Sequence, residues 1–201
     1  IENIKLKKFK TKEKIFSRYN IPMNQKVVMI TMHPETMSKT SINSQITSLI
    51  KSIVMKKNIF FIITSPSPDT GGIKMLNIIK RLVKNYSNIK LVESFGQDDY
   101  HNIMKYCSFV CGNSSSGIIE AASLGIKTLN IGERQKGRQL SNQTINVKNN
   151  FNEISKGIDM ILKKKIKKIK NPYDGGKTSK KIFSIIENTD LDKVLVTKYD
   201  Y

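Results

Sequence analysis

Short apolar runs rich in β-branched residues alternate along this chain with longer segments of helical period, and this alternation restricts the fold more than any other feature. The pattern is typical of βαβ units, in which helices cover both faces of a parallel sheet. We expect strands at residues 27–32, 58–64, 89–92, 109–111, 127–131 and 144–147. We expect helices at residues 42–55, 72–84, 100–106, 116–124, 152–164 and 177–188, the last two closing the domain. The sequence therefore predicts an α/β fold, a Rossmann-like parallel sheet flanked by helices.

The first 22 residues stand outside this alternation. They are rich in lysine and have helical spacing at Phe9, Ile15 and Phe16. We interpret residues 1–22 as a linker or helix that enters from a preceding lobe, residues 23–190 as the Rossmann-like lobe, and residues 191–201 as a tail. The chain starts at Ile1 and not at a methionine, so we expect an upstream portion.

The longest apolar runs are about five residues long, far shorter than the roughly 18 residues that a membrane span needs. No apolar signal core stands at the N-terminus. We therefore expect a soluble, cytoplasmic protein without a membrane segment. The two cysteines, Cys107 and Cys111, are too few for a disulfide scaffold and have no partners at zinc-site spacing. We interpret them as small core residues, and we expect neither a metal nor a cofactor.

The formal net charge of +19 raises the hypothesis of nucleic-acid binding, because basic side chains that neutralise phosphates drive such binding. The kind of charge argues against it. Among the 35 basic residues only four are arginines, whose planar fork suits phosphates and bases better than lysine does. We therefore expect no nucleic-acid partner and attribute the many lysines to a bias in composition.

The loop from Gly112 to Glu120 follows an apolar strand and opens a helix, a place where open parallel sheets bind ligands. A serine N-cap satisfies part of the helix start, and the remaining N–H groups and the positive helix end favour a phosphate. Glu120 would repel a phosphate but can accept hydrogen bonds from a ribose diol. This combination suggests a nucleotide, although an ordinary serine cap beside a solvated glutamate fits the same residues.

Three more loops are expected at the same edge of the sheet. The first strand ends at His33, which is followed by a proline. Residues 65–72 form a rigid turn of prolines and glycines, weak evidence by itself. Residues 132–138 contain Arg134 and Arg138, and arginine in so lysine-rich a chain suggests fixed, bidentate contact with an anion. The alternatives are a structural histidine and a solvated charged loop.

Taken together, these loops resemble the C-terminal half of UDP-N-acetylglucosamine 2-epimerases of the hydrolysing kind, which serve the synthesis of sialic or legionaminic acids. The similarity extends from about Lys14 to Ile186. Its stretches are TMHPET at 31–36, SPDTGG at 67–72 in part, the block from 94 to 138 that contains GNSSSGIIEA and NIGERQKGR, and NPYDGGK at 171–177. Non-hydrolysing relatives usually have an arginine after the histidine and a D-S-G-G serine loop, so Pro34 and Asn113 favour the hydrolysing branch.

The resemblance implies the C-terminal lobe of a glycosyltransferase-B-type, two-lobed enzyme with UDP in the cleft. Ser114 and Ser115 would contact the diphosphate and Glu120 the ribose, while the backbone at Ser94 and Phe95 would frame the uracil. His33, the candidate catalytic residue, would lie near the phosphates or the sugar. Ser67 stands where relatives often have asparagine. The implied nucleotide-binding residues are Ser67, Ser94, Phe95, Asn113, Ser114, Ser115, Ser116, Glu120 and Arg134.

The reaction that the resemblance implies removes the proton at C2, eliminates UDP, and adds water to the resulting glycal to give a manno-configured sugar. The substrate would be UDP-N-acetylglucosamine or a UDP-diacetamido sugar. The acids and bases are expected in a missing N-terminal lobe, so this half alone would be inactive, and relatives suggest a homo-oligomer. Two alternatives remain open: the same lobe in a nucleotide-sugar-dependent glycosyltransferase, and a non-catalytic nucleotide-sugar binding module.

Overall fold

The computed structural model describes residues 1–165 and 169–190, and its centre is a six-stranded sheet in which all neighbouring strands are parallel. The strands run in the order β3-β2-β1-β4-β5-β6. Their bounds are Lys26–Thr31 (β1), Ile59–Thr64 (β2), Ile89–Val92 (β3), Phe109–Gly112 (β4), Thr128–Ile131 (β5) and Thr144–Val147 (β6). The predicted α/β fold is confirmed, and the strand ends differ from the prediction by one residue at most.

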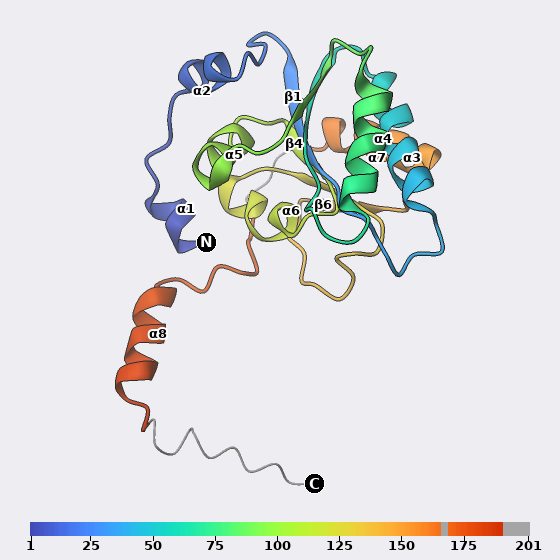
Figure 1. The fold of residues 1–201 in the computed structure, drawn as a ribbon. Coiled ribbons are helices and arrows are strands. Elements are labelled where there is room, and N and C mark those ends of the chain that lie inside the picture. Colours follow the sequence, from blue (N-terminus) through green and yellow to red (C-terminus); the bar gives the residue numbers. More distant parts are fainter. Residues whose placement is uncertain (166–168, 191–201) are drawn as a thin grey trace, which may run out of the picture.

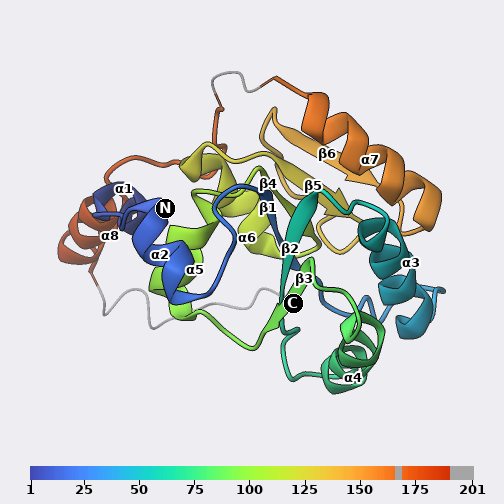
Figure 2. The same cartoon turned by 90° about the horizontal axis from the view of Figure 1, so that it is seen from above.

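Helices cover both faces of the sheet, as Figures 1 and 2 show. Helices α3 (Ile42–Val54), α4 (Gly72–Val83) and α7 (Phe151–Lys163) pack on one face. Helices α2 (Lys12–Arg18) and α5 (Gly96–Met104) pack on the other. Every residue of β2 is buried because apolar side chains meet a helix layer on each side. The strand order reverses between β1 and β4, and open parallel sheets commonly bind ligands outside the carboxyl ends of their strands at such a switch point.

The predicted helix at residues 116–124 is two elements, α6 (Ser115–Ile119) and the 3₁₀ helix η1 (Ala121–Leu124). The hydroxyl of Thr128 donates to the carbonyl of Gly117 at 2.6 Å, and the amide of Asn171 donates to the carbonyl of Ile119 at 2.8 Å. These side chains take carbonyl acceptors that a continuous helix would use itself. Helix α5 starts four residues before the prediction.

The N-terminal residues form two helices, α1 (Glu2–Leu6) and α2, with Phe9 in the connection between them. Ile15 and Phe16 of α2 are fully buried against the body. Arg18 forms an ion pair with the buried Asp99 of α5 at 2.9 Å. Residues 12–18 are therefore packed onto the lobe, whereas the domain boundary at residue 22 stays a prediction.

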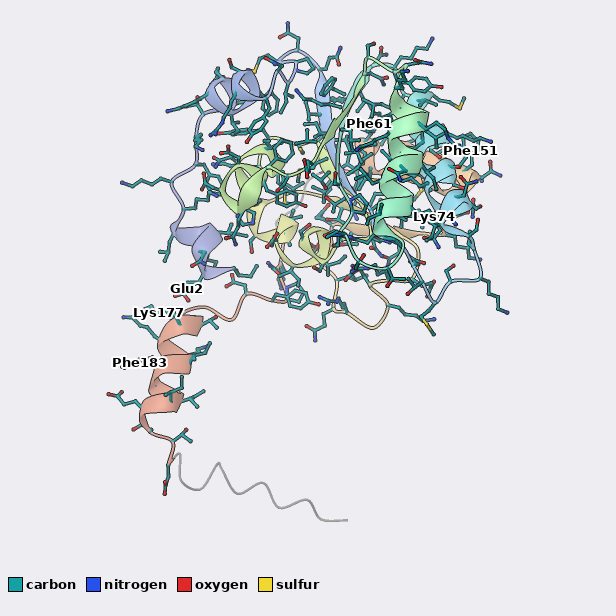
Figure 3. The ribbon with its side chains drawn as sticks, in the orientation of Figure 1. Glu2, Phe61, Lys74, Phe151, Lys177 and Phe183 are labelled. Carbon is teal, nitrogen blue, oxygen red and sulfur yellow. The ribbon has the colours of Figure 1, made fainter. Side chains whose placement is uncertain are left out.

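Helix α8 (Thr178–Glu187) does not close the domain, contrary to the prediction. It has no buried residue and stands apart from the sheet, with Phe183 on its exposed surface (Figure 3). Figure 2 places it beside α1, where Glu2 accepts hydrogen bonds from the amide and hydroxyl of Ser179 at 2.9 and 2.6 Å. The apolar face of α8 therefore belongs to neither of the two hydrophobic cores, which lie on the two faces of the sheet. The predicted tail, residues 191–201, lies outside the described residues.

Cys107 and Cys111 are both buried, and burial raises the pKa of each thiol to about 12. Their interpretation as core residues is confirmed. Among the described residues, no helix combines the length and the apolar character that crossing a membrane requires.

Candidate functional site

Three of the four predicted loops meet at the carboxyl ends of β1, β4 and β5. Asn113, directly after β4, accepts a hydrogen bond from the backbone N–H of His33 at 2.7 Å and donates to the carbonyl of His33 at 2.8 Å. The guanidinium of Arg134, after β5, donates to the carbonyl of Asn113 at 3.2 Å. Residues that are 80 and 21 positions apart are thus joined through one asparagine.

Asn113 is fully buried, and its side chain is engaged with protein. Its carbonyl also accepts from the side-chain amide of Gln135 at 2.8 Å. The other side-chain atom of Gln135, Oε1, is buried with no hydrogen-bond partner among the described residues. The structure therefore gives the Asn113 side chain a bracing contact between loops, and its predicted contact with a nucleotide stays a prediction.

The fourth loop joins the site through His33. The backbone N–H and the hydroxyl of Ser67 lie 3.3 and 3.2 Å from Nδ1 of this histidine. Because a backbone N–H can only donate, Nδ1 accepts, and the neutral ring carries its proton on Nε2. Burial lowers the pKa of His33, and the nearby Arg134 lowers it further, while Asp69 opposes them. The site therefore contains a neutral histidine with an N–H donor, held by the serine that was predicted to contact the nucleotide.

Glu35 is a site residue that the sequence analysis missed. Its Oε1 accepts from the backbone N–H groups of Glu133 and Arg134 at 3.1 and 3.3 Å, and lies 3.5 Å from the amide nitrogen of Asn113. The approach is so close that a Cβ at Gly132, where φ is +79°, would lie 2.2 Å from this oxygen. One carboxylate thus holds the β5 loop against the β1 loop. Its only signal in the sequence is its position two residues after the histidine.

The serine loop leads into α6 at the same edge. Ser114 is the N-cap, and its hydroxyl oxygen accepts from the backbone N–H of Ser116 at 3.4 Å. Ser114, Ser115 and Ser116 are all half-buried. Because α6 has only five residues, hydroxyls and local N–H groups contribute more here than the dipole of a long helix. The loop therefore offers short-range donors to an anion.

A pocket of about 240 Å³ lies at the ends of β2 and β3, and Ser94, Phe95 and Tyr100 contribute to its lining. The hydroxyl of Tyr100 lies 2.7 Å from that of Ser116 and so connects this pocket with the serine loop. The ring of Phe95 is buried edge-on against Tyr19, with ring centroids 4.7 Å apart, and this contact fixes one part of the pocket lining. The hydroxyl of Ser94 accepts from the N–H of Gly96 at 3.1 Å and fixes the turn into α5. Larger hollows of about 420 and 690 Å³ lie by the starts of β1 and β2 and contain none of the predicted residues.

Glu120 follows α6 at its C-terminal end, one turn past the serine loop. Its side chain is 29% exposed, and an oxygen lies 3.4 Å from Nε2 of the buried His101. The carboxylate of Glu120 thus has the imidazole of His101 on its buried side and retains exposed surface for a polar ligand. The contact with His101 is a second feature that the sequence did not indicate.

Comparisons with known proteins place the chain among relatives of known name. A family model described as UDP-N-acetylglucosamine 2-epimerase matches residues 1–187. A hydrolysing UDP-N,N'-diacetylbacillosamine 2-epimerase from Legionella pneumophila is 27% identical over 198 residues, covering 98% of this chain and 52% of the relative. A hydrolysing GDP/UDP-N,N'-diacetylbacillosamine 2-epimerase from Campylobacter jejuni is 31% identical over 198 residues, covering 96% and 51%.

The fold is shared with the Methanocaldococcus jannaschii UDP-GlcNAc 2-epimerase, solved in complex with UDP-GlcNAc and UDP. The TM-score is 0.68 at 18% identity, and the alignment covers 94% of this chain and 51% of that one. The chain spans about half the length of the curated relatives that it matches.

Proposed function

This chain belongs to the UDP-N-acetylglucosamine 2-epimerase family, and we propose that it is the UDP-binding C-terminal lobe of a hydrolysing UDP-sugar 2-epimerase. The observation that carries the proposal is that the loops after β1, β2, β4 and β5 meet at one edge of the sheet, where Asn113, His33 and Glu35 link them. The substrate is UDP-N-acetylglucosamine or a UDP-diacetamido sugar. The names of the relatives and the bound nucleotides in the solved structure support this choice.

In this proposal the serine loop binds the diphosphate through the hydroxyls of Ser114 and Ser115 and the N–H group of Ser115, while Ser116, whose hydroxyl and N–H both donate to Ser114, supports the loop. Arg134 lies over the same charge and supplies a fixed cation. Glu120, supported by His101, accepts hydrogen bonds from the ribose hydroxyls. The backbone at Ser94 and Phe95 frames the uracil in the adjoining pocket.

The proposed reaction removes the proton at C2 of the sugar and breaks the C1–O bond to UDP, which leaves a glycal. Water then adds across the double bond, with inverted stereochemistry at C2. Negative charge develops on the departing UDP, and groups placed in advance around that charge lower the barrier. Arg134, the serine hydroxyls and the neutral His33 Nε2–H are the donors at this position, while the acids and bases that act at C2 belong to an N-terminal lobe.

Titration calorimetry with UDP tests the binding site. We expect Arg134→Ala to weaken UDP binding about tenfold or more, because it removes charge-assisted hydrogen bonds to phosphate. Arg81→Ala on α4, which removes the same charge far from the site, is the matched control and should leave the affinity unchanged. Equal losses in both variants would mean that only the overall positive charge attracts the nucleotide.

A second titration separates the sugar of the nucleotide from its phosphates. Glu120→Ala should weaken UDP more than it weakens inorganic pyrophosphate, because pyrophosphate has no ribose. Equal losses for both ligands would reject the ribose assignment. The activity itself is tested on a two-lobed protein that contains this chain: release of UDP and free manno-configured sugar supports the epimerase, whereas transfer of the sugar to an acceptor supports a glycosyltransferase.

A further inference from the structure

A line of hydroxyl groups runs from the centre of the sheet to the serine loop. Thr64 Oγ1 lies 2.7 Å from Thr31 Oγ1, which lies 3.3 Å from the hydroxyl of Tyr100. The Tyr100 hydroxyl lies 2.7 Å from Ser116 Oγ, which donates to Ser114 Oγ at 3.1 Å. We call these five residues, Thr64, Thr31, Tyr100, Ser116 and Ser114, the hydroxyl chain.

The number of hydrogens available fixes the direction of the outer hydrogen bonds of the chain. At its inner end Thr64 donates to the carbonyl of Ile30 at 3.3 Å, so Thr31 donates to Thr64. A hydroxyl has one hydrogen to donate, and Ser116 uses its hydrogen toward Ser114. The contact between Tyr100 and Ser116 then requires Tyr100 to donate. Ser114 already accepts two hydrogen bonds, from the backbone N–H and the hydroxyl of Ser116, which fill its two lone pairs. Its own hydrogen is therefore available to a group outside the chain, and that group must be an acceptor.

Tyr100 of α5 links the hydroxyls of β1 and β2 to those at the start of α6. The cavity that Thr31, Tyr100, Ser114 and Ser116 help to line has a volume of about 10 Å³. This is about the space that one water needs, and far too little for a ligand. Burial also raises the pKa of Tyr100, so its hydroxyl keeps its hydrogen at neutral and moderately alkaline pH. Tyr100 is therefore available as a hydrogen-bond donor to Ser116.

We propose that Tyr100 is a positioning residue, whose hydroxyl donates to Ser116 and thereby holds the Ser114 hydroxyl as a donor toward the diphosphate. The inference rests on the proposed function, since it needs a phosphate at the serine loop. An ionised phosphate oxygen only accepts hydrogen bonds, so it suits a serine whose lone pairs are already occupied. Tyr100 acts through Ser116 and Ser114 and does not touch the ligand's phosphates itself.

The variant Tyr100→Phe removes one oxygen and keeps the ring. Tyr106→Phe is the matched control, because the Tyr106 hydroxyl donates to the carbonyl of Lys10 at 2.6 Å, away from the serine loop. In titrations of the whole chain we expect Tyr100→Phe to weaken UDP about five- to tenfold and uridine less than twofold. Tyr106→Phe should change neither. A purely structural role for Tyr100 would move both ligands together.

A double-mutant cycle with Ser114→Ala identifies the route of the effect. If Tyr100 acts through Ser114, Tyr100→Phe should have almost no further effect on UDP binding once Ser114 is alanine. The same loss in both backgrounds would overturn the inference. If Tyr100→Phe proves unstable in urea unfolding, Ser116→Ala breaks the same route one step nearer the ligand and should weaken UDP about five- to tenfold; no loss there would also overturn the inference.

The outcomes separate the two proposals. A wild-type chain that binds no UDP contradicts the proposed function, and the role of Tyr100 with it. A wild-type chain that binds UDP, together with a Tyr100→Phe variant that binds it equally well, contradicts the role of Tyr100 alone.

Discussion

Helices α7 and α8 are alike in sequence, since both repeat isoleucine at helical spacing among lysines, but the structure treats them oppositely. Ile154, Ile158 and Ile161 of α7 are 0% exposed and belong to the core between the sheet, α3 and α7. On α8, Ile182 is 52% exposed and Ile185 is 66% exposed. Helical period therefore predicts that an apolar face exists, whereas the residues that cover this face come from elsewhere in the chain.

The two helices also differ in the contacts at their ends, which are more numerous in α7. The side chain of Asn150 caps α7 by accepting from the N–H of Glu153 at 3.0 Å. At its other end, the buried Lys127 ammonium donates to the carbonyls of Ile161 and Lys164 at 2.6 and 3.0 Å. Helix α8 has no side-chain cap, and Glu2 holds its first turn from α1. Helix α7 is thus held by a local cap at its start and by a long-range contact at its end, whereas Glu2 contacts α8 only at its first turn.

The largest expected difference comes from the same substitution on each helix. Ile158→Ala should lower the free energy of unfolding by about 2–5 kcal/mol, because it opens a cavity in the core. Ile185→Ala should change it by less than about 0.5 kcal/mol, because the side chain is mostly in water already. Urea unfolding measures both. Similar losses in the two variants would show that the apolar face of α8 is covered in solution.

A smaller effect is expected at the cap of α7. Lys127→Met keeps most of the apolar stem and leaves two carbonyls without their donor, so we expect a loss of about 1–3 kcal/mol. Lys163→Met, on an exposed lysine of the same helix, is the control and should be nearly neutral. Burial lowers the pKa of Lys127, and the nearby charges of Lys26 and Lys164 lower it further. The charged form is thus disfavoured by its surroundings, and the two hydrogen bonds to carbonyls offset this cost. If Lys127→Met leaves the free energy of unfolding unchanged, this interpretation is wrong.

The smallest effect concerns the link between α1 and α8. The hydrogen bonds from Ser179 lower the pKa of Glu2, and the hydrogen bond from Lys5 lowers that of Asp174. A carboxyl whose pKa is lower when folded stabilises its contact above the unfolded pKa and loses this contribution as pH falls through the folded pKa. We therefore expect the protection factor of the Ser179 amide in hydrogen exchange, which corrects for the slower intrinsic exchange in acid, to fall as the pH drops below about 4.5, before protection in α7 changes.

The variant Glu2→Gln is the control for that measurement, since an amide at this position does not titrate. The pH dependence at Ser179 should become weaker in it. If the dependence is unchanged, Glu2 does not hold α8.

The sheet was predictable because β2 is an uninterrupted apolar run whose residues are buried on both sides. The break between α6 and η1 was not, since Thr128 and Asn171, which cause it, act from 11 and 52 residues away. Long-range hydrogen bonds leave no period in a sequence. The position of α8 was beyond prediction for the same reason, because no local pattern states what a helix packs against.

The candidate site divides along the same line. The His33, Ser114 and Arg134 loops were predictable because they follow strands, and a parallel sheet brings the carboxyl ends of its strands to one edge. Glu35 and Tyr100 were missed because their importance depends on Arg134 and Ser116, partners that only the fold brings near. Ser67 and Asn113 were predicted as ligand contacts, and the structure adds that their side chains hold His33 and its loop.

The contact between Glu35 and the turn at Gly132 has a mechanical consequence. One carboxylate oxygen holds two successive amide hydrogens of the other loop, and Gly132 leaves no space for even a methyl group between them. The histidine segment and the arginine segment are thereby joined through a single carboxylate group. A displacement of either segment must carry the other with it, so the imidazole of His33 and the guanidinium of Arg134 cannot change position independently.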